Sequence, residues 1–153
     1  SYAPAHAAMA MVYLRRYGGQ RDPQWIKLAE QYARKAVELN PELAAAQLSF
    51  GFLQLEKGQP AEAALSLTKA LELDPTNAHT YVHLARAQRI QQDTAAADAS
   101  LGKALELAPN DWYVHVLRPR PGIGCRDRTG ASCHCANWRL RDAFTHHPRM
   151  ARK

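Results

Sequence analysis

Residues 35–41 of the chain read KAVELNP, residues 69–75 read KALELDP, and residues 103–109 read KALELAP. The prolines that close these segments, Pro41, Pro75 and Pro109, are separated by intervals of 34 residues. A fixed period of about 20 to 50 residues is typical of stacked supersecondary units, because each unit buries its apolar face only against its neighbours. The repeated segment therefore predicts a repeat architecture for most of this 153-residue chain.

Each repeat has room for two helices, because apolar residues recur at helical spacing between the prolines. In the second repeat these residues are Leu48, Phe50, Leu53, Leu55, Ala63, Leu67, Ala70 and Leu71. Gly58 is typical of a helix C-terminus, and Pro60 suits a first helical turn, where no amide partner is needed. Asp93 or Thr94 can cap the corresponding helix of the next repeat.

The repeat boundaries follow from these signals. We expect repeats at about residues 3–43, 44–77 and 78–111, and a partial fourth repeat at residues 112–117, which together form one domain at 1–117. The first repeat is longer by seven residues around positions 15–24. There we expect Gly18 and Gly19 to end one helix, and Asp22 and Pro23 to cap and begin the next.

The pattern resembles the tetratricopeptide repeat (TPR) family, in which small and large residues alternate at set positions. The second repeat carries Phe50, Gly51, Ala63, Leu67, Ala70 and Pro75 at those positions, and the third carries Tyr81, Leu84, Ala85, Ala97, Leu101, Ala104 and Pro109. Small residues there allow paired helices to approach to about 8 to 10 Å. The resemblance implies an all-α fold of antiparallel helix-turn-helix repeats stacked as a right-handed superhelix.

The same resemblance implies a protein-interaction scaffold without catalysis, which binds a peptide or helix in a groove along the first helices. The implied groove residues are Met11, Leu14, Leu48, Phe52, Leu55, His79, Val82, Arg86 and Arg89. Leu48, Phe52 and Val82 have an equal claim to be interhelical core. Because Arg86 and Arg89 are cationic, we expect a partner segment with an acidic end. An analogy with arrays attached to bacterial signalling proteins suggests a bacterial protein with a region upstream of this chain. We expect the protein to be cytoplasmic.

Signals for chemistry are weak. The glycine pair at 18–19 does not match a dinucleotide-binding fingerprint, and no motif brings together a catalytic triad. His79 and His83 are four residues apart, but two ligands without a third make a poor metal site. We therefore expect no catalytic residue, no metal and no cofactor.

No stretch reaches the roughly 18 apolar residues of a membrane helix, nor does the start resemble a signal peptide. Because the chain begins with Ser1, we expect it to be part of a longer or processed protein.

Charge divides the chain near residue 117. Residues 1–117 hold 11 Lys and Arg against 12 Asp and Glu, whereas residues 118–153 hold 9 against 2, so the net charge of +6 arises from the tail. Pro119 and Pro121 interrupt the helix that begins the fourth repeat. One hypothesis is that the reading frame changes near Leu117. Residues 118–153 would then be an irregular tail, rich in Arg and Cys, that did not evolve as part of this fold. The alternatives are nucleic-acid or acidic-partner binding through its arginines, which we consider less favoured, and zinc binding, for which the cysteine spacing is poor. Without a capping helix, the last repeat is expected to self-associate.

Overall fold

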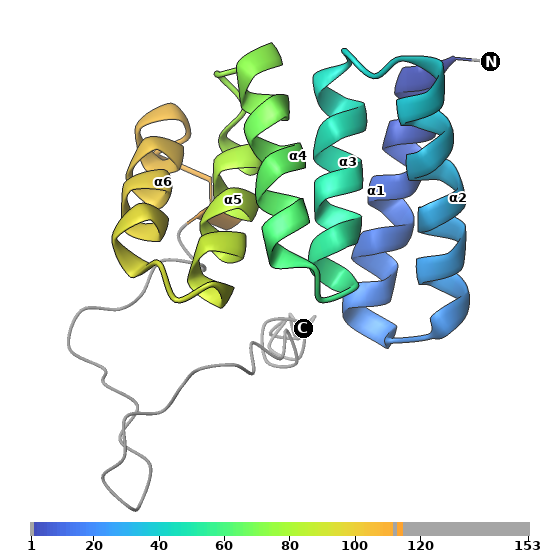
Figure 1. Ribbon diagram of the computed structural model, residues 1–153, viewed down its shortest axis with the longest axis horizontal. Coiled ribbons are helices and arrows are strands. Elements are labelled where there is room, and N and C mark those ends of the chain that lie inside the picture. Colours follow the sequence, from blue (N-terminus) through green and yellow to red (C-terminus); the bar gives the residue numbers. More distant parts are fainter. Residues whose placement is uncertain (1, 112, 115–153) are drawn as a thin grey trace, which may run out of the picture. The chain divides into compact units, whose positions relative to one another are not determined.

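The computed structural model describes residues 2–111, 113 and 114, and this part of the chain contains six α-helices and no strand. They are α1 (Ala3–Gln20), α2 (Pro23–Leu39), α3 (Ala44–Glu56), α4 (Pro60–Leu73), α5 (Ala78–Ile90) and α6 (Thr94–Leu107). Figure 1 shows them as three antiparallel pairs that follow one another in chain order. The predicted all-α fold of helix-turn-helix repeats is thereby confirmed.

The helices pack in two ways. Within a repeat, α1 packs on α2, α3 on α4, and α5 on α6; between repeats, α3 packs on both α1 and α2, and α5 packs on both α4 and α3 (Figure 1). Among the six described helices, no second helix of a pair contacts another second helix. The first helices α1, α3 and α5 therefore connect the repeats, and any surface shared by several repeats has to include them.

Local signals determine where the helices begin. The Asp22 side chain accepts a hydrogen bond of 2.9 Å from the Gln24 amide, and the Asp93 side chain accepts one of 3.0 Å from the Ala96 amide. Such caps satisfy amides at the start of a helix that have no intrahelical partner. Gly58 has a φ of +77°, a region open to glycine, and α4 begins two residues later at Pro60. These expected starts and stops are confirmed, with Asp93 as the cap residue of α6.

One predicted boundary is wrong. Gly18 and Gly19 do not end a helix, because α1 continues to Gln20. Arg21 takes the left-handed conformation instead, with a φ of 55°, and its amide donates to the Tyr17 carbonyl. The helix therefore continues past both glycines, and the connection to α2 shortens to two residues. This places Arg21 at the end of α1, where its side chain reaches the next repeat.

Small residues occupy the helix crossings, as predicted. In α3, Gly51 faces α4 so closely that a Cβ atom built on it would lie 2.7 Å from Leu67 Cγ. Ala10 and Ala85 replace Gly51 in the other two repeats, and both are buried. Their partners on the second helices are also buried, namely Ala29, Ala33, Ala36, Ala63, Leu67, Ala70, Ala97, Leu101 and Ala104. These residues form the cores of the helix pairs.

The start of the fourth repeat is also described. Tyr113 and Val114 are helical, and Val114 is fully buried against Val82 and Ala104. Part of the apolar surface of α5 and α6 is therefore covered by this segment. The predicted domain boundary near residue 117, the Arg-rich and Cys-rich tail and its three cysteines lie outside the described residues.

Candidate functional site

A cluster of aromatic, histidine and charged side chains lies where α3 meets α5 and the start of the fourth repeat. We call it the histidine-arginine cluster and define it by its members: Phe52, Glu56, His79, His83, Arg86 and Tyr113. Phe52 and Glu56 are one helical turn apart on α3, and His79, His83 and Arg86 occupy successive turns of α5. Because residues three or four apart share a helix face, each helix presents its members side by side.

The aromatic half of the cluster centres on His83. The Phe52 and His83 rings are stacked, with centroids 4.2 Å apart. Tyr113 also lies close, with its ring 6.2 Å from the His83 ring and 5.7 Å from the His79 ring. Ring contacts at these separations are favourable beyond the area that they bury. Three repeats therefore contribute to one aromatic group.

His83 is neutral in this environment. Its side chain is 3% exposed, and burial, followed by the nearby charges of Arg86, His79 and Arg15, lowers its pKa to about 3. Burial also raises the pKa of Tyr113. The buried Nδ1 atoms of His79 and His83 have no hydrogen-bond partner within the described residues, and His79 Nε2 lies 3.4 Å from Asp111 Oδ2. Buried polar atoms are normally paired, so two unpaired nitrogens on one helix face are unusual.

The charged half of the cluster is held by one carboxylate. Glu56 Oε1 lies 2.7 Å from Arg86 Nη1, and Glu56 Oε2 lies 3.3 Å from Arg21 Nη1. The Glu56 side chain is 3% exposed, whereas those of Arg86 and Arg21 are 32% and 56% exposed. Since Arg21 follows α1, Glu56 ends α3 and Arg86 lies on α5, this ion cluster links all three repeats.

The predicted groove residues separate into two groups. Leu14, Leu48, Leu55 and Val82 are at most 7% exposed and pack in apolar clusters between helices, so their assignment to an open groove is corrected. The physical reason is that the first helices also contact the next repeat, and these apolar positions fill that contact. Phe52 is equally buried and packs in the same apolar cluster as Leu14, while its ring also stacks on His83 in the histidine-arginine cluster. The half-buried residues are Met11, His79, Arg86 and Arg89.

The sequence pattern does not predict the ion cluster of Arg21, Glu56 and Arg86. It predicts that Arg86 receives an acidic group from a partner, but this arginine already binds Glu56, which is 30 residues away in the chain. It also places Arg21 in a connecting segment and Tyr113 in an interrupted repeat. No local pattern joins these residues. Only the repeat register, which places Phe52 of one repeat at the position of Arg86 in the next, could have suggested that they are neighbours.

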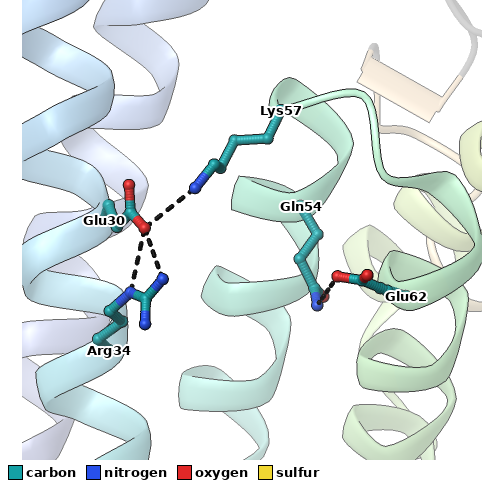
Figure 2. A network of polar contacts seen from close by, with 5 residues as sticks. All are labelled: Glu30, Arg34, Gln54, Lys57 and Glu62. Atoms are coloured by element: carbon teal, nitrogen blue, oxygen red, sulfur yellow. Dashed lines mark hydrogen bonds and ion pairs between the residues drawn. The ribbon is translucent and has the colours of Figure 1, made fainter.

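A second polar network lies where α2, α3 and α4 meet, and Figure 2 shows it from close by. Glu30 accepts from Lys57 Nζ at 3.0 Å and from Arg34 Nη2 at 2.7 Å, and the hydrogen bonds from Lys57 and Arg34 lower the pKa of Glu30. Gln54 points toward Glu62, with its Nε2 at 3.5 Å from Glu62 Oε2 (Figure 2). These residues line a hollow of about 140 Å³.

Neither a metal site nor a membrane-spanning helix is found within the described residues. Within the described residues, no group of three or more histidine, cysteine, aspartate or glutamate side chains is placed to hold a metal ion. None of the described helices combines the length and the apolar character that crossing a bilayer requires.

Comparisons with known proteins agree with this architecture. A family model described as tetratricopeptide repeat matches residues 54–118. A thermophilic TPR protein from Thermus thermophilus is 25% identical and has a TM-score of 0.62, over 75% of this chain and 61% of that chain. An O-GlcNAc transferase from Thermobaculum terrenum has the same TM-score at 23% identity, over 75% of this chain and 22% of that chain. No curated protein sequence matches the chain.

The two solved structures extend beyond the region shared with this chain, which spans less than two thirds of either. The likeness to the transferase shows the fold alone. Helical repeats of this kind generally act as non-catalytic scaffolds that bind protein partners. The family model, the repeat packing and the solved structures agree: residues 54–118 match the tetratricopeptide repeat family, and the described helices share the fold of TPR proteins.

Proposed function

We propose that this chain is a protein-interaction scaffold and that its first helices bind a peptide or helical segment of a partner protein. The observation that carries the proposal is the histidine-arginine cluster, because it gathers side chains from successive repeats on the first helices. A partner segment that follows these helices would contact several repeats at once.

The residue types in the cluster support binding. Aromatic and arginine side chains dominate the energy of protein interfaces, because they bury large areas and make directional contacts. Met11, His79, Arg86 and Arg89 are half-buried, so each keeps surface that a partner can cover.

The proposal contains no catalytic step. His83, which could act as a base, is neutral and stacked against Phe52, and no nucleophile is hydrogen-bonded to its Nδ1 within the described residues. Recognition therefore explains the cluster better than acid-base chemistry, which needs a base within reach of the proton that it moves.

The proposal can be tested by selecting peptides from a displayed random 12-residue library on the immobilised full chain. Arg89→Glu reverses a charge on α5, and Lys69→Glu reverses the same charge on the exposed side of α4. We expect selected peptides to lose at least about tenfold in affinity with Arg89→Glu and little with Lys69→Glu, because only the first changes the first helices. Equal losses in both variants, or no enriched peptide, would contradict the proposal.

A further inference from the structure

The charges around Glu56 are not balanced. Three guanidinium groups lie on or beside the histidine-arginine cluster, those of Arg15, Arg21 and Arg86, whereas the carboxylates described there are Glu56 and Asp111. Arg15 is exposed, and its charge acts on both His83 and Tyr113. Asp111 is paired with His79, so Glu56 is the carboxylate that neutralises the arginines within the described part of the chain. This surface is therefore cationic, although residues 1–117 as a whole are slightly acidic.

Glu56 uses a small part of the hydrogen-bonding capacity of its partners. A guanidinium group has five N–H donors, and Arg21 and Arg86 each donate one bond to Glu56 through Nη1. The two arginine side chains keep 56% and 32% of their surface exposed. A second carboxylate could approach the same pair of arginines, and guanidinium groups bind carboxylates with well-defined geometry.

We propose, building on the proposed function, that Arg21 and Arg86 bind the side-chain carboxylate of an Asp or Glu residue in the partner segment, and that Glu56 competes with it from within the chain. The arginines are the positive half of the site. Glu56 holds them together but neutralises one of their two charges, so the partner carboxylate meets a site of reduced net charge.

Replacing the competing carboxylate should strengthen binding. Glu56→Gln keeps the size and shape of the side chain but removes its charge, which leaves both arginines available to the partner. We expect an acidic peptide to bind about threefold to tenfold more tightly, because its carboxylate then meets two arginines that are partly exposed and no longer neutralised. The gain should shrink with added salt, because exposed charges are screened.

The test uses the full chain and the peptides selected on it, made with an amidated C-terminus so that a side chain is the only source of carboxylate. The dissociation constant of each acidic peptide, and of its Glu→Gln version, is measured by fluorescence anisotropy. Glu38→Gln is the matched control, since it removes the same charge from a pair whose side chains are 64% and 51% exposed on α2. We expect tighter binding with Glu56→Gln, unchanged binding with Glu38→Gln, and no gain for the Glu→Gln peptide.

Folding is monitored separately, because Glu56 links three repeats and its loss can destabilise them. Circular dichroism at the assay temperature shows whether Glu56→Gln is helical. If Glu56→Gln is not helical, Arg86→Gln in the otherwise unchanged chain provides the test. Arg86→Gln should weaken the binding of the acidic peptide at least about tenfold more than it weakens the binding of the Glu→Gln peptide.

The outcomes separate the two proposals. Peptides that bind but show no preference for acidic side chains, or that bind folded Glu56→Gln no more tightly, would overturn the competition by Glu56 and leave the scaffold proposal standing. An absence of selected peptides would overturn both.

Discussion

The helix crossings and the histidine-arginine cluster lie on the same helices but are built differently. At the crossings, the three repeats carry Ala10, Gly51 and Ala85 at one equivalent position, all small and all buried. One residue further along each helix they carry Met11, Phe52 and Arg86, which share neither size nor charge. The crossing has one geometric solution, whereas the neighbouring position can vary without changing the fold.

This difference separates the residues that fix the helix packing from the residues at which we propose that a partner binds. A crossing residue is constrained by the distance between two helices, so its substitution should change the free energy of unfolding. A cluster residue is constrained by its chemical neighbours, so its substitution should change binding or pH dependence more than stability. The substitutions below test that distinction, and the one with the greatest predicted loss of stability comes first.

Leu67→Ala should cause the largest loss. Leu67 is fully buried, and its side chain packs directly on the backbone of Gly51. The truncation leaves a cavity at the crossing, so we expect the free energy of unfolding to fall by about 2–5 kcal/mol. Urea denaturation followed by circular dichroism measures it. A loss below about 1 kcal/mol would show that the crossing is loosely packed and would remove the distinction.

His83→Phe should change the pH dependence of stability. The pKa of His83 is about 3 in the folded chain and 6.5 when the side chain is free in water, so between these values the unfolded chain binds more protons. Stability from this residue is therefore present above pH 6.5 and is lost as pH falls, by up to about 1.4 kcal/mol per pH unit. Urea denaturation at pH 7, 6 and 5 measures the slope.

Phe keeps the ring that stacks on Phe52 but cannot be protonated. The slope of stability between pH 7 and 5 should therefore be smaller in His83→Phe than in the unchanged chain. Identical slopes would mean that His83 binds its proton in the folded chain as readily as in the unfolded chain, and that His83 is more open to water than its 3% exposure indicates.

Gly51→Ala and Gly102→Ala form a matched pair. A Cβ on Gly51 would lie 2.7 Å from Leu67 Cγ, whereas a Cβ on Gly102 in α6 would meet nothing within 4 Å among the described residues. Alanine favours a helix by about 1 kcal/mol over glycine, and overpacking opposes it by about 1–3 kcal/mol at Gly51 alone. We expect Gly102→Ala to raise the melting temperature and Gly51→Ala to leave it unchanged or lower it. An increase in both variants would refute a tight crossing.

Glu30→Gln should have the smallest effect. Glu30 also binds two cations, but its side chain is 29% exposed, and those of Lys57 and Arg34 are 36% and 61% exposed. We expect a loss of about 0.2–1 kcal/mol, because water screens such pairs. Thermal unfolding at low and high salt checks it. A loss as large as that of Leu67→Ala would show that ion pairs, and not the crossings, hold the first two repeats together.

Much of the fold can be predicted because the same sequence pattern occurs three times in the chain. Gly58 and Pro60 mark the turn between α3 and α4, and Asp93 marks the start of α6. The end of α1 escapes prediction, because two glycines suggest a stop but nothing in the local sequence shows that Arg21 takes the left-handed conformation. A positive φ is uncommon for a residue other than glycine, so an arginine in the sequence does not predict one. The surrounding structure stabilises this conformation.

The candidate site is less predictable than the fold. The position of Arg86 on a shared face can be read from the repeat register, but its pairing with Glu56 cannot. The apolar residues Leu14, Leu48, Leu55 and Val82 look the same in sequence whether they face a groove or the next repeat. Hydrophobic spacing shows that a residue is on the buried side of a helix, but not which neighbour buries it.

The period, the pairing of helices and the small residues at their crossings follow from the amino-acid sequence, because they depend on local propensity and on a spacing repeated along the chain. The sequence does not show that Glu56 binds both Arg21 and Arg86, or that the buried His83 ring contacts Phe52 and Tyr113; the packing of the repeats brings these residues together. Those contacts join residues from different repeats, and their distances depend on how each helix pair packs against the next.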